Sequence, residues 1–195
     1  EKMWDKTEEN ISIPATDMEH YAEHPDVIFV CVKGYSLQET IPFIKRIARK
    51  NTIVIPVLNI YGTGGKMQKE LPDLLVTDGC IYVSANIKEP GKLLQHGQIL
   101  HIVFGVRDKA EFRPELKEIQ KDLCDSHIDG TLSENIRREA LEKFSYVSPI
   151  GAAGLYYHAT AADFQKEGEA RELFKTMIKE IAALAEAMGV PRSEE

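Results

Sequence analysis

Cysteine is scarce in this sequence, and its few cysteines show no sign of a shared structural role. Cys31, Cys80 and Cys124 are odd in number, widely separated and not at metal-ligand spacing. The sequence therefore predicts neither a disulfide framework nor a zinc or other metal site. It favours a reducing compartment, and we expect a cytoplasmic protein.

Two further absences narrow the class of protein. No apolar run approaches the roughly 20 residues that a bilayer-spanning helix needs, and the first residues contain no signal-peptide core. Positive charge is also in short supply, since the formal net charge is −7 and the pI is about 5.5. Because a nucleic-acid-binding protein would show a basic patch or stripe, we expect a protein that binds neither nucleic acid nor membranes.

What is present is a chain with enough apolar residues for a substantial core. Its 195 residues, 43% of them hydrophobic, suffice for one large domain or two small ones. The chain begins at Glu1 without a Met, and its first β-α-β unit enters as though a sheet had already started upstream. We therefore expect a piece of a longer protein.

The clearest pattern is this β-α-β unit. An amphipathic segment at residues 36–49 lies between two apolar, β-branched runs, at residues 27–32 and 53–58. Continuous apolar runs are typical of parallel strands buried on both faces. Polar residues follow both runs, Lys33 after the first and Asn59 after the second. Ligands of open α/β sheets bind beyond the carboxyl ends of the strands, so we expect Lys33 and Asn59 to face one crevice.

A glycine-rich segment follows Asn59, with Gly62, Gly64 and Gly65 in the run I-Y-G-T-G-G-K. Such a turn can bind phosphate through its backbone N–H groups, but the spacing matches neither a P-loop nor a dinucleotide motif, which favours a flexible crossover loop. Further strands are expected at residues 74–76, 80–85 and 91–105, the last a pair broken at His96 and Gly97.

The second half of the chain has helical periodicity. A helix is predicted from about residue 134 to 147, stopping before Pro149, and another from about residue 169 to 188. Lys143 lies on the edge of the first helix's apolar stripe. A lysine facing an apolar cleft loses some preference for its charged form and can donate a proton at neutral pH. The alternative is a snorkelling surface lysine.

Lys33 and Asn59 are open to two interpretations as well. A lysine at a strand end often only solvates the sheet edge, and an asparagine there often makes a turn. The asparagine amide can also donate and accept hydrogen bonds at once, which suits contact with both a cofactor and a keto or hydroxyl substrate.

Five stretches of the chain, taken in order, resemble the ketopantoate reductase (2-dehydropantoate 2-reductase) family: D-V-I-F-V-C-V-K-G-Y, V-I-P-V-L-N-I-Y-G, G-C-I-Y-V-S-A…E-P-G…H-G-Q, I-R-R-E-A-L-E-K-F and A-R-E-L-F…E-I-A-A-L-A-E-A-M-G-V. The resemblance runs from about Ile11 to Val190. It implies an NADPH-dependent reduction of a 2-keto acid to a 2-hydroxy acid on the route to pantothenate and coenzyme A.

The resemblance also implies roles for individual residues. Lys33 is expected to contact the cofactor, and Asn59 to lie between cofactor and substrate. Ala85 is expected to lend backbone near the nicotinamide. Lys143 is expected to be the general acid, in contact with the substrate, because an ammonium stabilises the charge that hydride delivery builds on a carbonyl oxygen.

The chain departs from the family at usually polar positions. Asparagines are usual where it has Val147 and Gly151, and a polar substrate contact is usual where it has Ala161. A first alternative is therefore a related reductase of another 2-keto acid. A second is a non-catalytic descendant that keeps the scaffold for dimerisation or small-molecule sensing, although a scaffold needs no lysine on an apolar edge.

The predicted fold class is α/β, a partial Rossmann-type parallel sheet followed by an all-helical C-terminal domain. We assign residues 1–126 to a partial NADP-binding domain and 127–195 to a truncated substrate and dimerisation domain, like the C-terminal domain of 6-phosphogluconate dehydrogenase. The family's G-x-G-x-x-G and its last helices, which bring a serine and a glutamate, are not in these residues. We expect this piece to be inactive alone, and the full protein to bind a small 2-keto acid and NADPH and to be able to form a homodimer.

Overall fold

Two three-stranded sheets form the centre of the fold, which a computed structural model describes for residues 10–190. The first sheet is parallel, with its strands side by side in the order β1 (Val27–Val30), β2 (Ile53–Pro56), β3 (Leu75–Val76). The second consists of β4 (Asp78–Glu89), β5 (Lys92–Gly105) and β6 (Asp129–Leu132). In it β4 and β5 are antiparallel, while β6 runs parallel to β5.

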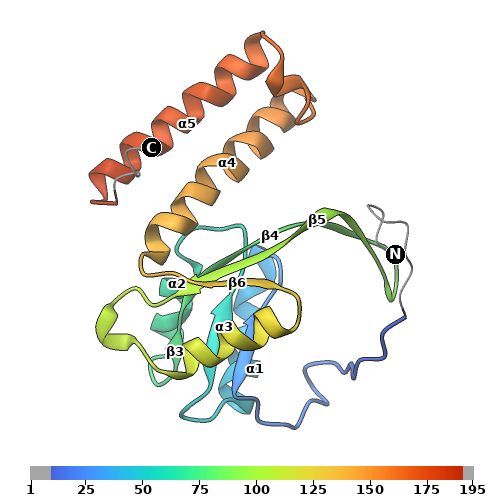
Figure 1. The fold of residues 1–195 in the computed structure, drawn as a ribbon, viewed down its shortest axis with the longest axis vertical. Helices are drawn as coiled ribbons and strands as arrows, with labels where there is room; N and C mark the ends of the chain where they lie inside the picture. Colours follow the sequence, from blue (N-terminus) through green and yellow to red (C-terminus); the bar gives the residue numbers. More distant parts are fainter. Residues whose placement is uncertain (1–9, 191–195) are drawn as a thin grey trace.

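Helices surround the sheets and continue the chain beyond them. The α-helices are α1 (Leu37–Ile47), α2 (Thr63–Glu70), α3 (Glu115–Asp125), α4 (Ile136–Tyr157) and α5 (Glu169–Ala187), with 3₁₀ turns η1 (Gly34–Ser36), η2 (Lys109–Glu111) and η3 (Asp163–Gln165). Figure 1 shows α4 and α5 side by side, standing away from the sheets, and the β4–β5 hairpin reaching out to one side. This confirms the predicted fold class.

The apolar runs form strands because both of their faces are covered. Val54 of β2 belongs to a buried cluster with Ile44 of α1 and Met67 of α2. Its neighbour Ile55 points to the opposite face and belongs to a second cluster with Leu116 of α3. Each such side chain contributes about 1.5–3 kcal/mol on burial. The predicted β-α-β unit is therefore confirmed.

The glycine-rich segment is a helix and not the flexible crossover loop that we predicted. Gly62 lies at a φ of 74° and serves as N-cap, and α2 begins directly after it at Thr63. A positive φ suits glycine, which has no Cβ to clash. Two glycines in the first turn of a helix weaken its propensity, so the sequence pattern alone favoured a loop.

The expected break in the second sheet is a bulge and not a chain reversal. The hairpin turns at Gly91, between β4 and β5, and β5 continues past His96 and Gly97. The pairing shifts register between Val83 and Ala85, and Gly97 has a φ of 76°. Irregular sequence in a strand can thus mark a bulge, which re-aims side chains without ending the strand.

Helix α4 is longer than predicted because Pro149 does not end it. Asn135 is the N-cap, and its side chain accepts a hydrogen bond from the Arg138 N–H at 3.3 Å. The helix continues through the buried Pro149 to Tyr157. An interior proline costs about 3 kcal/mol because a backbone hydrogen bond is lost. The packing of α4 along α5, seen in Figure 1, offsets that cost.

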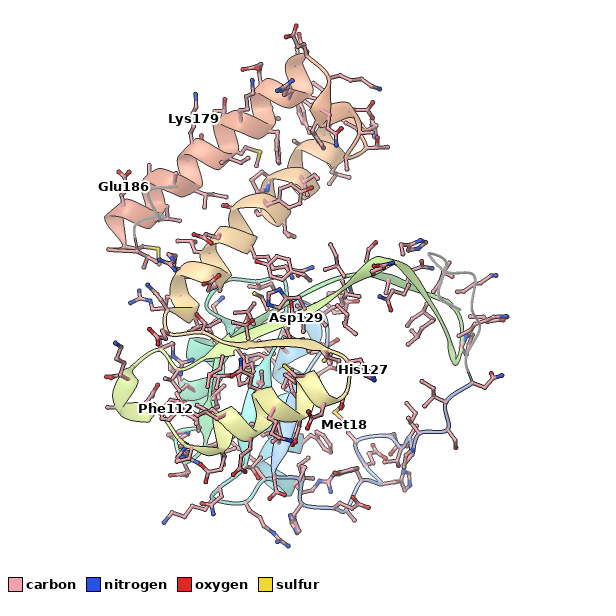
Figure 2. The ribbon with its side chains drawn as sticks, in the orientation of Figure 1. Met18, Phe112, His127, Asp129, Lys179 and Glu186 are labelled. Carbon is pink, nitrogen blue, oxygen red and sulfur yellow. The ribbon has the colours of Figure 1, made fainter. Side chains whose placement is uncertain are left out.

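The last helix ends within one residue of the predicted position: α5 stops at Ala187, Met188 is its C-cap, and Gly189 follows at a φ of 66°. Its outward face is charged, and Figure 2 shows Lys179 and Glu186 pointing away from α4. Within residues 10–190, no helix combines the length and apolar character needed to cross a membrane. Strand β6 pairs with β5, so residues 129–132 belong to the second sheet. The division into domains at residue 126 stays a prediction.

Candidate active site

The carboxyl ends of two neighbouring strands form one side of the site. β1 and β2 are adjacent and parallel, with Val30 paired to Pro56, and Lys33 and Asn59 each follow three residues later. The two loops touch, because Gly34 lies against the side chain of Ile60. Both polar side chains are exposed. The crevice that we inferred from the strand order therefore has Lys33 and Asn59 on the same edge.

Lys143 of α4 is buried, which rules out the snorkelling interpretation. Its residue is 8% exposed. The ammonium nitrogen Nζ donates a hydrogen bond to the backbone carbonyl of Ile81 in β4. It also lies 4.7 Å from the centre of the Tyr82 ring, within the range of a cation–π contact. Helix α4 thus delivers the lysine to the surface of the second sheet.

Burial changes the acidity of this lysine. Desolvation lowers the pKa of Lys143, and the neighbouring Cys80 thiol opposes that shift. The sign follows from charge, since the protonated lysine is the charged form and a poorly hydrated site disfavours it. A lysine with a lowered pKa releases its proton more readily at neutral pH than an exposed one does.

A cavity of about 740 Å³ opens beside Lys143. Asn59, in the loop after β2, and Lys143, on α4, both line this cavity. Val147 also lines it, one helical turn beyond the lysine on α4. Its other walls come from the β4–β5 bulge and from α4: Ile81, Tyr82, Val83, Ser84, His96, Gly97, Gln98, Ile99, Glu142 and Tyr146. This volume is within the usual range of small-molecule sites. The structure thus brings Asn59 and Lys143 together.

Lys33 and Ala85 are not among the residues that line this cavity. Ala85 is an exposed residue of β4, next to Ser84, which does line it. Lys33 lies at the crevice edge described above. Their expected contacts with a cofactor remain predictions.

Sequence reasoning missed Tyr82. The signal was available, because residues alternate across a strand and Cys80, Tyr82 and Ser84 therefore share one face of β4. Tyr82 and Cys80 belong to the contact between the second sheet and the start of α4, together with the buried Ile136. What the sequence did not reveal is that α4 crosses this face with Lys143 above the tyrosine.

The N-terminus of α2 is already occupied by a carboxylate of the chain itself. The backbone N–H groups of Gly64 and Gly65 donate to the Asp78 carboxylate, which lies 3.6 Å from Arg107 Nη1. Burial raises the pKa of Asp78, and Arg107 and the two N–H groups oppose that shift. Because these donors are used, this glycine-rich helix start is not a free phosphate cradle.

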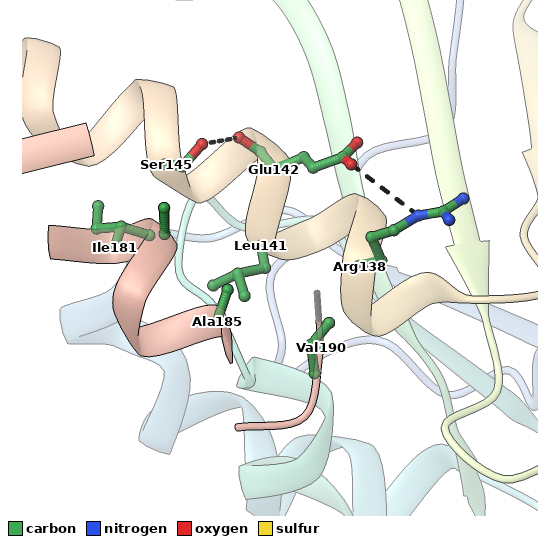
Figure 3. A pocket seen from close by; sticks show the side chains of 8 residues that line it. Arg138, Leu141, Glu142, Ser145, Ile181, Ala185 and Val190 are labelled. Carbon is green, nitrogen blue, oxygen red and sulfur yellow. Dashed lines mark hydrogen bonds and ion pairs between the residues drawn. The ribbon is translucent and has the colours of Figure 1, made fainter. Parts of the chain in front are cut away.

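A second, much smaller pocket lies between α4 and α5. Figure 3 shows Leu141, Ile181, Ala185 and Val190 meeting there, with Arg138 and Glu142 at its rim. Its volume is about 10 Å³, about enough for one water molecule. We interpret it as packing between the two helices and not as a ligand site.

These features define the class of protein: an α/β protein with a Rossmann-type sheet, a helical continuation and a lysine–asparagine cavity between the two. A family model described as ketopantoate reductase PanE/ApbA matches residues 3–109, and the model of that family's C-terminal region matches residues 135–195. The chain belongs to the ketopantoate reductase family, a family of oxidoreductases.

Curated relatives are distant and longer. The chain is 20% identical over 176 residues to 2-dehydropantoate 2-reductase of Aquifex aeolicus, covering 90% of this chain and 57% of the relative. It is 20% identical over 192 residues to the enzyme of the same name from Streptococcus pyogenes, covering 96% of this chain and 61% of the relative. The chain therefore spans somewhat more than half the length of these relatives.

Solved structures show the same fold. Dimeric ketopantoate reductase from Staphylococcus aureus aligns with a TM-score of 0.76 at 22% identity, over 91% of this chain and 57% of that one. A ternary structure of D-mandelate dehydrogenase with NADH and anilino(oxo)acetate aligns with a TM-score of 0.78 at 17% identity, over 90% and 56%. At these identities the likeness establishes the fold alone.

Proposed function

We propose that the full-length protein uses NADPH to reduce ketopantoate to pantoate, a step toward pantothenate and coenzyme A. Family membership supports the reaction type. The observation that carries the proposal is the pairing of a buried lysine with an exposed asparagine in one cavity at the carboxyl edge of the sheet. A carbonyl group placed there would have a proton donor on one side and an amide on the other.

In this proposal Lys143 is the general acid. When bound, the cofactor supplies the hydride to the carbonyl carbon. Charge then builds on the carbonyl oxygen, where the Lys143 ammonium stabilises it and transfers its proton from Nζ. The lowered pKa of Lys143 favours that transfer. Asn59, with a donor and an acceptor on one amide, orients the substrate and the cofactor together.

The described residues fit the nicotinamide end of such a cofactor. The cavity of about 740 Å³ has room for a nicotinamide ring and a small acid together, and Asn59 and Ser84 offer polar contacts on its walls. Lys33 would contact the cofactor from the crevice edge, and the Ala85 backbone would lie near the nicotinamide. Gly64 and Gly65 do not offer the phosphate contacts, because their N–H groups bind Asp78.

A second candidate, reduction of another 2-keto acid, is favoured by Val147. This side chain lines the cavity beside Lys143, where the resemblance leads us to expect an asparagine. The side chain of a valine cannot form a hydrogen bond with the hydroxyl group of ketopantoate, and an apolar substrate side chain would pack better against it. The resemblance also leads us to expect polar, substrate-binding residues where this chain has Gly151 and Ala161, so two further polar contacts with ketopantoate would be missing.

We also propose that the protein acts on its small-molecule substrate as a homodimer in the cytoplasm. The dimeric state described for the Staphylococcus aureus neighbour supports the first point. Light scattering on the purified full-length protein would measure its mass, and a monomer at working concentration would contradict the dimer.

The test of function is steady-state turnover by the full-length protein with NADPH or NADH. Ketopantoate and a panel of branched and aromatic 2-keto acids would be compared. We expect turnover with NADPH, and Lys143→Ala should lower kcat by about 10²-fold or more, the scale of a lost general acid. The exposed Lys121, which pairs with Asp125 on α3, provides the matched control, and Lys121→Ala should leave kcat unchanged.

The outcomes separate the alternatives. Preference for another acid of the panel over ketopantoate would support the second candidate. Absence of turnover with every acid would favour the non-catalytic scaffold. Full activity of Lys143→Ala would show that the proton comes from another group.

A further inference from the structure

A general acid in this position faces opposing requirements. It must carry its proton at the working pH, yet burial disfavours its charged form. Lys143 is 8% exposed, and the cavity walls nearest to it include Ile81, Val147 and Tyr146. Something in the site must therefore stabilise the ammonium without neutralising it, because a carboxylate pressed against it would hold the proton too tightly.

The contacts that the structure shows for the ammonium come from β4. Its Nζ donates to the Ile81 carbonyl and lies 4.7 Å from the ring centre of Tyr82. An aromatic face attracts a cation through its quadrupole but accepts no proton. These two contacts fix the end of the lysine and leave it donor capacity for a carbonyl group in the cavity.

Tyr82 is itself held in place from its other side. Its directly paired residue on β5 is His101, with the two rings 5.5 Å apart between centres. His101 is in turn fixed by β6, because its Nε2 lies 3.2 Å from Thr131 Oγ1 and its Nδ1 lies 3.5 Å from Asp129 Oδ2. The second sheet thus fixes the ring on which the ammonium rests.

We propose that Tyr82 is a positioning residue for Lys143, whose ring face holds the ammonium at the cavity and keeps it protonated despite burial. This rests on the proposed function in one respect only, namely that Lys143 is the group that protonates the substrate. The proposal concerns the ring and not the hydroxyl group.

The other titratable groups around the pair do not replace this role. Burial raises the pKa of Tyr82 to about 12, with smaller contributions from Cys80, Glu139 and Glu142, so its phenol stays neutral while the lysine titrates. Burial also raises the pKa of the Cys80 thiol, the other β4 group that acts on the lysine. Glu142 lines the cavity but has an ion-pair partner, Arg138, 4.0 Å away.

The test measures the pKa of Lys143 in the full-length protein without substrate. Acetic anhydride acylates only neutral lysines, so the acylation rate of the peptide that contains residue 143, followed by mass spectrometry against pH, reports that pKa. Tyr82→Leu removes the ring and should lower it by about one unit, the scale of a desolvated cation–π contact. Tyr82→Phe keeps the ring and should keep the wild-type value.

Two controls make the result decisive. Phe112→Leu removes a second ring–lysine contact, the one 5.8 Å from Lys117, and should leave the pKa of Lys143 unchanged. Pentafluorophenylalanine at position 82 keeps the ring's shape and reverses its quadrupole. It should lower the pKa as Tyr82→Leu does, and it decides the matter if the leucine variant does not fold.

An unchanged Lys143 pKa in both ring-modified proteins would overturn the proposal, and so would a drop as large in Tyr82→Phe. In a protein that turns over a 2-keto acid, the basic limb of the kcat profile should move down by the same amount. Absence of turnover would refute the proposed function, while the acylation measurement would still decide the role of Tyr82.

Discussion

Gly64 offers a sharp test of the packing that holds the glycine-rich helix against the second sheet. A Cβ at this position would overlap with the Thr77 carbonyl oxygen and with Asp78 Oδ1, and would come within 2.8 Å of Arg107 Nη1. Two of these three atoms belong to buried residues, Thr77 and Asp78, so they cannot simply move into solvent. In Gly64→Ala, helix α2 must therefore shift away from β4.

The magnitude follows from what that shift breaks. Moving α2 separates the Asp78 carboxylate from the N–H groups of Gly64 and Gly65, a loss on the scale of a helix cap, about 0.5–2 kcal/mol. Overpacking of a rigid site adds about 1–3 kcal/mol. The better helix propensity of alanine offsets about 0.5–1 kcal/mol of this loss. We expect the free energy of unfolding to fall by about 2.5 kcal/mol in total.

Urea unfolding followed by circular dichroism measures this change, with the midpoint falling at constant m. A thermal melt should show a Tm lower by about 5–10 °C for a chain of this size. Gly65→Ala is the matched control, because its Cβ would meet only the Arg107 side chain, with Cδ at 3.9 Å and Nε at 4.0 Å, which is ordinary van der Waals contact. It should be neutral or slightly stabilising. Equal midpoints for Gly64→Ala and wild type would refute the close packing of α2 on β4.

Two further predictions concern α4. Asn135→Ala should lower the free energy of unfolding by about 1 kcal/mol, because the helix loses its N-cap, whereas Asn135→Asp should retain most of it; urea midpoints of the two variants would show this, and equal losses would contradict it. Turnover should fall as pH rises through the pKa of Lys143, because the acid is active only when protonated. Since burial lowers this pKa, the fall in kcat should occur below the ordinary lysine value of about 10.4. A kcat profile that stays flat up to that value would exclude Lys143 as the acid.

The local sequence pattern was sufficient to predict the elements whose burial follows directly from their own run of apolar residues. The run at residues 53–58 is apolar at every position because β2 is covered on both faces, so its strand, its parallel partner β1 and the crossover helix could be read directly. The same logic placed Lys33 and Asn59 at one edge. Strand order also explains why this part of the site was predictable, since it requires only that neighbouring parallel strands end together.

Elements that are stabilised by contacts with residues far away in the sequence could not be predicted from the local pattern. Helix α2 depends on Asp78, a residue of the next sheet, to bind its first N–H groups, and nothing within the glycine run reveals that partner. Likewise α4 continues through Pro149 because α5 packs along it. In both cases tertiary contacts override a weak local propensity.

The candidate active site depends both on local sequence pattern and on tertiary contacts, which explains why only some of its residues were predicted from the sequence. Periodicity placed Lys143 at the edge of an apolar stripe, but a stripe edge does not specify whether the side chain reaches solvent or a neighbouring sheet. The contact between Ile136 at the start of α4 and Cys80 of β4 decides this, because it sets the helix across the strand face that carries Tyr82. Lys143 lies seven positions after Ile136, almost two helical turns further along α4. The lysine therefore lies on the same side of the helix as that contact, directly above the tyrosine. The acidity of Lys143 is thus a consequence of how α4 packs on the second sheet, and any substitution that tilts the helix there should change the pKa of the lysine before it changes the fold.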